Sequence, residues 1–346
     1  RAEGERPLRP SPLLAGCAMS AVPAPARSAA PCLPAEAIDD AQGPPLHPGE
    51  PVRGGTALLA AQAACPAWAF HRYRLGAEAL PVPAAGLDAM ARGSLVHAAL
   101  EAFWRGRRHA DLAAMDAAAR AAEIVRVVEL ALTRHDRDAA EPLPPRLREL
   151  EARRLAGLIE DWLALEATRA DFDVVACEEA HRLVIEGVPI RIVVDRVDRL
   201  GDGRFAIIDY KTGRSDGSAG WARERLAEPQ LPIYAALAFP DRDVAAVALA
   251  RVGREAAGFV GVAADEGLLP GVSGLAGQRK RYPEQEFADW AALRRVWGER
   301  LRAVAREVRD GVAGVVFASA KDLQYCEVKP LLRLAEAGAP VEEDGE

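Results

Sequence analysis

The stretch from Asp195 to Lys211 constrains the fold of this chain more than any other. Its outer acids, Asp195 and Asp209, each follow a largely apolar run, and residues 201–203 between them read Gly-Asp-Gly. This tripeptide is a strong signal for a hairpin turn. A hairpin there brings Asp195 near Asp209 on adjacent strands. Because strand side chains repeat with a period of two, Lys211 projects from the same face as Asp209.

Two carboxylates and an ammonium group on one sheet face suit a divalent cation beside an activated water. Hydrolysis of a phosphodiester needs such a water and a charge that stabilises the phosphoryl oxygens, and Mg²⁺ held by carboxylates supplies both. Lys211 would orient the water or help to deprotonate it, and the carbonyl of Tyr210 offers another oxygen ligand. A solvated strand end is the alternative for each acid and the more common one for a lone Asp-x-Lys. We expect Asp198 at the turn, away from the metal.

Three further motifs bear on the site. His97 and Glu101 lie four residues apart, on one face of an apolar helix, although a single buried histidine is more often a core residue. Glu178 ends an alternating strand and adds a third carboxylate; Glu179 competes for this place, but the alternation of residues 172–176 favours Glu178. Gln230 and Tyr234 also share a helical face, and a helix N-terminus is the alternative there.

The order of apolar patterns predicts a mixed α/β fold. Helical patterns cover residues 56–75, 86–104, 112–132, 146–168, 229–237 and 284–310, and strand patterns cover residues 172–178, 181–185, 188–195, 205–211 and 244–252. The strands before residue 211 form an antiparallel meander within a mixed sheet that helices flank. Residues 1–54, rich in Pro, Ala and Gly, read as a linker or the remnant of an upstream region.

Composition excludes some classes of protein. The net charge of −7 gives no general basic field for nucleic acid, although a nuclease can confine positive charge to one groove. Basic clusters occur at residues 105–108, 278–282 and 294–295. No apolar run reaches membrane-spanning length. The five scattered cysteines do not form a disulfide framework and favour a reducing cytoplasm. Because the first residue is Arg, we expect a fragment or the tail of a longer polypeptide.

Together these motifs resemble the PD-(D/E)XK nuclease superfamily, and more narrowly the RecB/AddB-type nuclease domain of bacterial helicase–nuclease repair proteins. The resemblance rests on Asp195, the run Ile208-Asp209-Tyr210-Lys211-Thr212-Gly213, an upstream Gly-x-x-x-His helix and a downstream Gln-x-x-x-Tyr helix. It covers about residues 56 to 335. It implies a restriction-endonuclease-like core in a nuclease domain over residues 55–340. The helical part would span residues 55–170, the catalytic sheet 171–255 and the C-terminal helical part 284–335.

The resemblance also assigns roles to residues. His97, Asp195 and Asp209 would hold Mg²⁺, with Mn²⁺ as a possible substitute. The carbonyl of Tyr210, which its place between Asp209 and Lys211 suggests independently of the resemblance, would add an oxygen ligand. Lys211 would be the catalytic lysine and Glu178 an auxiliary acid. Gln230 and Tyr234 would belong to the helix beside the site.

One departure from the resemblance concerns cysteines. Many relatives hold an iron–sulfur cluster with one Cys before the domain and a Cys-x-x-Cys-x5-Cys run after it. This chain keeps Cys65 and Cys326, but Leu323 and Leu332 stand at the other two positions. Two thiolates do not hold a four-Cys cluster. We therefore predict no cluster here, and apolar packing of the two leucines in its place.

The leading hypothesis is a Mg²⁺-dependent DNA nuclease in recombinational repair, working in the bacterial cytoplasm beside a helicase. No phosphate-binding Gly-x-x-x-x-Gly-Lys-Ser/Thr loop occurs, so any motor would lie upstream or in a partner. The alternative is a non-catalytic DNA-binding or scaffolding module of a helicase–nuclease complex, whose mark would be a broken Asp/Asp/Lys set. A generic α/β binding protein with solvated acids is the third hypothesis, and the coincidence of the helix motifs argues against it.

Overall fold

The computed structural model describes residues 2–3, 6–7, 40–80, 86–213, 217–253 and 257–334. It divides into two units, Arg1–Asp39 and Asp40–Glu346. In the first unit, strands β1 (Ala2–Glu3) and β2 (Arg6–Pro7) pair antiparallel. The rest of the predicted linker up to residue 39 lies outside the described residues. The second unit holds the other helices and strands that the structure describes.

Residues 40–54, expected within the linker, belong to this folded unit. The N–H of Gly43 donates to the carbonyl of Gly311 at 2.8 Å, and the N–H of Leu46 donates to the carbonyl of Arg309 at 2.7 Å. Gly311 caps the last helix in the left-handed region, with φ of 80°, and a Cβ there would meet the carbonyl oxygen of Gly43 at 2.3 Å. Only glycine therefore fits where this segment crosses the helix end.

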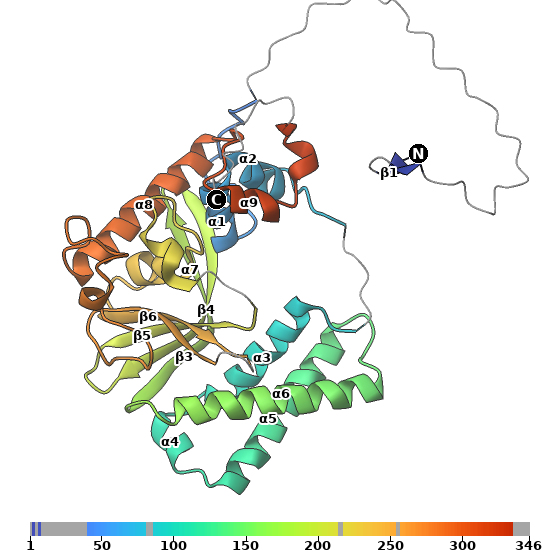
Figure 1. Ribbon diagram of the computed structural model, residues 1–346, viewed down its shortest axis with the longest axis vertical. Helices are drawn as coiled ribbons and strands as arrows, with labels where there is room; N and C mark the ends of the chain where they lie inside the picture. Colours follow the sequence, from blue (N-terminus) through green and yellow to red (C-terminus); the bar gives the residue numbers. More distant parts are fainter. Residues whose placement is uncertain are drawn as a thin grey trace, which may run out of the picture. The chain divides into compact units, whose positions relative to one another are not determined.

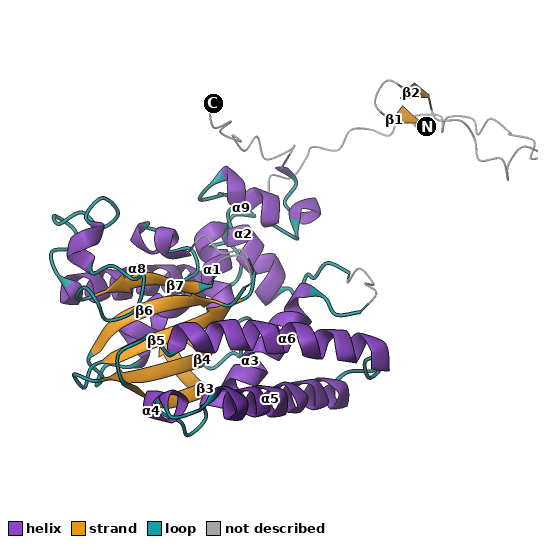
Figure 2. Ribbon diagram, turned by 60° about the horizontal axis from the view of Figure 1, so that its bottom comes forward, coloured by secondary structure: helices purple, strands orange, loops and turns teal. Residues whose placement is uncertain are grey.

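The central sheet has the strand order β3-β4-β5-β6-β7 (Figure 2). The strands are β3 (Phe172–Ile185), β4 (Val188–Leu200), β5 (Phe205–Lys211), β6 (Val244–Arg251) and β7 (Gly258–Ala263). Neighbours pair antiparallel except β5 and β6, which are parallel, so the predicted mixed sheet with an antiparallel meander is confirmed. The two strands expected over residues 172–185 are one continuous strand, and β7 was not predicted.

The connection between the parallel strands β5 and β6 carries the predicted Gln-x-x-x-Tyr helix. It contains the 3-10 helix η3 (Gly217–Ala222), helix α7 (Gln230–Ile233) and a π-helical turn, η4 (Tyr234–Ala238). A parallel pair needs such a crossover because its strands run in the same direction. The single predicted helix over residues 229–237 is thus a short α-helix that continues as a π-turn.

Helices cover both faces of the sheet (Figure 1). On one face, α1, α7 and α8 share a core with the strands. On the other face, α3, α5 and α6 share a second core with the same strands. The remaining helices have the bounds α1 (Thr56–Ala64), α2 (Pro66–Ala69), η2 (Phe70–Arg74), α3 (Ala89–Trp104), α4 (His109–Ala113), α5 (Ala117–Asp138), α6 (Pro145–Glu166), η5 (Leu275–Gln278), α8 (Trp290–Asp310), α9 (Ala320–Tyr325) and η6 (Lys329–Leu331). Of the described helices, none is both long and apolar enough to cross a bilayer.

Three helices begin later than the apolar pattern predicts, and in each case an aspartate caps the first turn. The carboxylates of Asp88, Asp116 and Asp289 each accept a hydrogen bond from the N–H three residues ahead, at 2.7 Å. These bonds satisfy donors that the helix itself leaves unpaired. The caps therefore set the starts of α3, α5 and α8.

A small apolar cluster joins the two ends of the predicted nuclease domain. Cys65 and Cys326 are both buried in it, together with Val328 and Leu332. The predicted packing of Leu332 beside the two cysteines is confirmed. Leu323, half-buried on α9, is not among the described residues of this cluster, so the prediction for this leucine is wrong.

Candidate active site

The β4–β5 hairpin brings the predicted acids together. Pairing of Arg196 with Ile208 sets Asp195 opposite Asp209 across the two strands. The N–H of Tyr210 donates to the carboxylate of Asp195 at 2.8 Å. The ammonium of Lys211 lies 2.8 Å from a carboxylate oxygen of Asp209. The hairpin and the shared face of Asp209 and Lys211 are therefore confirmed.

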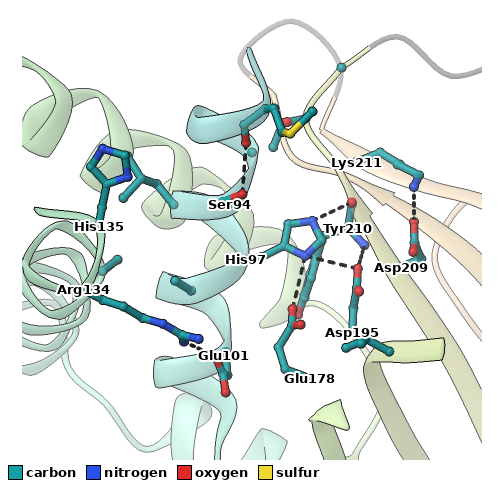
Figure 3. Close-up of a pocket in the computed structure, with 18 of the residues that line it drawn as sticks. Ser94, His97, Glu101, Arg134, His135, Glu178, Asp195, Asp209, Tyr210 and Lys211 are labelled. Carbon is teal, nitrogen blue, oxygen red and sulfur yellow. Dashed lines mark hydrogen bonds and ion pairs between the residues drawn. The ribbon is translucent and has the colours of Figure 1, made fainter. Parts of the chain in front are cut away.

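Helix α3 brings His97 to this hairpin (Figure 3). Its Nδ1 lies 3.2 Å from Oε1 of Glu178 and 3.4 Å from Oδ2 of Asp195. Its Nε2 lies 3.0 Å from the carbonyl oxygen of Tyr210. The imidazole thus joins one helix to three strands of the sheet.

Glu178, and not Glu179, faces the site. Glu178 has a φ of 48°, a left-handed conformation that is uncommon for a residue with a side chain. The carboxylate of Glu179 instead lies 3.3 Å from Nε2 of His181. The strained backbone at Glu178 accompanies the placement of its carboxylate beside His97.

The candidate metal donors are His97, Glu178 and Asp195. One donor atom from each lies within 4.8 Å of the other two. The two carboxylates suit a hard cation such as Mg²⁺ or Mn²⁺, whereas the imidazole is a ligand more typical of later transition metals. The side chains present therefore fit a divalent cation. Glu178, expected as an auxiliary acid, is thus one of the three candidate donors, whereas Asp209, expected as a metal ligand, pairs with Lys211.

Crowded acids raise the proton affinity of this cluster. Burial lowers the pKa of His97, but the carboxylates of Glu178 and Asp195 outweigh burial and raise that pKa to about 9. Burial, and then the charge of Asp209, raises the pKa of Asp195 to about 8. Burial also lowers the pKa of Lys211, but Asp209 outweighs it, so the net shift is upward. At neutral pH Lys211 is a cation, and the cluster holds protons that a metal ion would displace.

Mg²⁺ binding should therefore strengthen as pH rises. Below the raised pKa values of His97 and Asp195, Mg²⁺ must displace a proton from each group. For each proton displaced, the apparent Mg²⁺ affinity falls about tenfold for every pH unit by which the pH is lowered. Calorimetric titration of the metal-free protein at pH 6, 7 and 8 should show tightening of at least this size at each step. The same Mg²⁺ affinity at all three values would contradict the proton–metal competition.

Gln230 and Tyr234 are brought together, but only one of them reaches the cleft. Nε2 of Gln230 donates to the hydroxyl of Tyr234 at 2.9 Å, and this hydroxyl donates to the carbonyl of Val193 on β4. Gln230 lines the cleft, whereas Tyr234 is 1% exposed and does not line it. The Tyr234 hydroxyl therefore connects the start of η4, and Gln230 of α7, to the strand that carries Asp195.

The site opens into a cleft of about 860 Å³ between α3, α5 and the strands β3, β4 and β5. Besides the predicted residues, Arg134 and His135 of α5 and Arg191 of β4 line it (Figure 3 labels the first two). Sequence reasoning missed these basic residues. A signal existed for Arg191, because it alternates with Val193 and Asp195 along one strand.

The predicted basic clusters do not line this cleft. In the cluster at residues 294–295, the guanidinium of Arg294 donates to the carbonyl of Ala235 at 2.8 Å. In the cluster at residues 278–282, Arg281 donates to the hydroxyl of Ser218 at 2.8 Å. In the cluster at residues 105–108, Arg105 pairs with Glu101. These arginines make contacts within the fold.

The expected place of Asp198 is wrong. It lies within β4 and is fully buried, where its carboxylate pairs with Arg196 and Arg169. The turn itself begins after Leu200. Asp198 is nevertheless outside the metal-donor trio, as expected.

Comparison with known proteins agrees with this geometry. Residues 58–331 match the PD-(D/E)XK nuclease superfamily. No curated protein matches the chain. The matched range contains the donor trio and the Asp209–Lys211 pair. The chain belongs to the PD-(D/E)XK nuclease superfamily.

Proposed function

We propose that this chain is a divalent-cation-dependent deoxyribonuclease that acts beside a helicase in recombinational repair in the bacterial cytoplasm. The observation that carries the proposed chemistry is the convergence of His97, Glu178 and Asp195 beside the Asp209–Lys211 pair. The repair role, the helicase partner and the location rest on the resemblance to RecB/AddB-type domains. Cleavage of DNA is the part that the geometry supports best.

In this proposal the acidic side chains and His97 hold the metal ion, and the basic side chain of Lys211 contacts the substrate. A bound Mg²⁺ would polarise the scissile phosphoryl group and lower the pKa of a coordinated water. Lys211, a cation at neutral pH, would sit against the developing negative charge on the phosphoryl oxygens. Its raised pKa argues against a role as proton acceptor. Asp209 holds the ammonium of Lys211 in place at 2.8 Å.

Replacing Lys211 with Met should reduce cleavage of single- and double-stranded DNA about a hundredfold or more, because the cationic partner of the phosphoryl group is lost. The measurement is single-turnover cleavage in Mg²⁺. Lys280→Met, at an exposed position, is the matched control and should cleave like wild type. Equal cleavage by all three proteins would overturn the assignment of Lys211. A folded wild-type protein without activity on either DNA would contradict the nuclease proposal.

The cleft should bind phosphates beyond the scissile one. Arg191 lies four residues before Asp195 on β4, about 13 Å along the strand. Arg134 of α5 lies 3.2 Å from Glu101 and also lines the cleft. A substrate that spans several nucleotides reaches these cations, whereas a small phosphodiester does not.

Arg191→Ala should therefore raise the KM for an oligonucleotide about tenfold and leave hydrolysis of bis(p-nitrophenyl) phosphate unchanged. Arg182, paired with Arg191 across the strands but outside the cleft lining, provides the control variant Arg182→Ala. Arg182→Ala should change neither the KM for the oligonucleotide nor the hydrolysis of bis(p-nitrophenyl) phosphate. An unchanged oligonucleotide KM in Arg191→Ala would remove Arg191 from the DNA path.

A further inference from the structure

A buried ionic network lies behind the candidate active site. Its members are Glu166 at the end of α6, Arg169 after that helix, and Arg196 and Asp198 of β4, and their side chains are at most 2% exposed. The guanidinium of Arg196 donates to Glu166 at 2.7 Å and to Asp198 at 2.6 Å. Arg169 lies 2.7 Å from Glu166 and 2.8 Å from Asp198. Two positive and two negative charges thus alternate around a closed ring.

Aromatic rings enclose this network and tie it to the helix that carries His97. The guanidinium of Arg196 lies over the ring of Trp104 at 4.3 Å, and the guanidinium of Arg169 lies over Phe172 at 3.9 Å. Trp104 and His97 both belong to α3. The network therefore contacts the helix and the strand that supply two of the three candidate metal donors.

Tyr210 connects the network to the site. Its hydroxyl accepts a hydrogen bond from Nη1 of Arg196 at 3.1 Å. Its N–H donates to Asp195 at 2.8 Å, and its carbonyl oxygen lies 3.0 Å from Nε2 of His97. The edge-to-face contact between the rings of Tyr210 and His97 has a centroid distance of 5.7 Å. One residue therefore meets the network through its side-chain hydroxyl and two metal donors through its backbone.

Stability alone is a poor explanation for four buried charges. Well-packed apolar side chains of similar volume commonly stabilise a core as well as a buried ion-pair network does or better, because burying charge costs desolvation free energy. Such a network does fix the orientation of its side chains, since each guanidinium group is held by two carboxylates. Groups behind metal ligands orient them, and their loss typically weakens metal binding tenfold to a hundredfold.

We infer that Arg196, held by Glu166 and Asp198, is a positioning residue that fixes Tyr210 and, through its backbone, the orientation of Asp195 and His97 for the metal ion. The inference rests on the proposed function for the presence of a metal ion, whereas the contacts that position Tyr210, Asp195 and His97 lie within the protein itself. It separates the roles of Tyr210: the carbonyl faces the site, and the hydroxyl anchors the residue.

Tyr210→Phe tests this inference, because it removes only the hydroxyl and leaves Arg196 paired with both carboxylates. Mn²⁺ titration of the metal-free protein, followed by electron paramagnetic resonance, should show about tenfold weaker binding than wild type. The Tyr210 amide should also exchange its hydrogen faster, since its bond to Asp195 loosens. Tyr282→Phe is the matched control. The hydroxyl of this buried tyrosine donates to the carbonyl of Ser218, away from the candidate metal donors, and removing it should change neither measurement.

The two measurements separate this inference from the proposed function. Unchanged Mn²⁺ binding together with unchanged amide exchange in Tyr210→Phe would overturn the inference. A wild-type protein that binds no Mn²⁺ would contradict the proposed function instead. Exchange of the Tyr210 amide in the metal-free protein would then test the positioning role by itself. Exchange faster than wild type in Tyr210→Phe but not in Tyr282→Phe supports this role. Exchange at the same rate in Tyr210→Phe and Tyr282→Phe overturns this role. Thermal unfolding close to wild type in Tyr210→Phe excludes a general loss of structure as the cause.

Discussion

Asp195→Asn is expected to lower DNA cleavage about a thousandfold while the fold stays intact. The variant keeps the shape of the side chain but removes the negative charge that a metal ion needs. Asp195 is 6% exposed, and burial with nearby acids raises its pKa to about 8, so its ionised form is unfavourable in the metal-free protein. The neutral amide should therefore leave the thermal unfolding temperature unchanged or raise it, as often occurs at active sites.

Single-turnover cleavage and thermal unfolding, measured on the same preparation, check this prediction. Asp202→Asn, in the exposed turn of the same hairpin, is the matched control and should keep full activity. A fully active Asp195→Asn variant would remove Asp195 from the site. A variant that unfolds at a much lower temperature would instead show that Asp195 is a structural residue.

Arg196→Met should lower the free energy of unfolding by about 3–5 kcal/mol, a large effect for one substitution. Methionine fills much of the same volume, but Glu166 and Asp198 then keep only Arg169 as a buried partner. The cost arises from a carboxylate charge left without compensation, because the ring of alternating charges is broken.

Denaturant unfolding of wild type and variant measures this difference. Arg199→Met is the control, since Arg199 on the same strand pairs with Asp173 at the surface and is 53% exposed. Loss of that exposed pair should cost less than about 1 kcal/mol. Equal costs for the two variants would mean that the buried network contributes no more than a surface ion pair.

The sequence predicted the centre of the site because its pattern is local. The Gly-Asp-Gly turn fixes the hairpin register, and that register places Asp195 opposite Asp209. The helix of His97 and the strand of Glu178 were also identified, but only the resemblance placed them at the same site. Their convergence depends on how α3 packs on the sheet, which no local pattern encodes.

The buried network escaped prediction for a physical reason. Asp198 was expected at the turn, where solvated charge is the usual outcome, and nothing in the local sequence marks Arg196 as buried. Both residues are buried because Glu166 and Arg169, some thirty residues earlier in the chain, supply partners of opposite charge. A pairing over such a distance is a tertiary contact and leaves no periodic pattern.

Missed elements have similarly identifiable causes. β7 is short, and its Gly261 approaches the neighbouring strand so closely that a Cβ would meet the carbonyl oxygen of Val247 at 2.0 Å. Glycine weakens the sequence pattern of a strand even where the structure requires it. The helix starts set by aspartate caps were, in contrast, readable from the sequence, since Asp88, Asp116 and Asp289 each directly precede a helix.

The most direct test of the account follows Mn²⁺ occupancy and DNA cleavage in the same samples. Metal-free protein is titrated with Mn²⁺, occupancy is read by electron paramagnetic resonance, and cleavage of an end-labelled single strand is measured at each point. We predict that cleavage rises in proportion to occupancy in wild type, and that Asp195→Asn loses both. Cleavage by wild type without bound metal, or unchanged Mn²⁺ binding in Asp195→Asn, would contradict a metal-dependent nuclease centred on His97, Glu178 and Asp195.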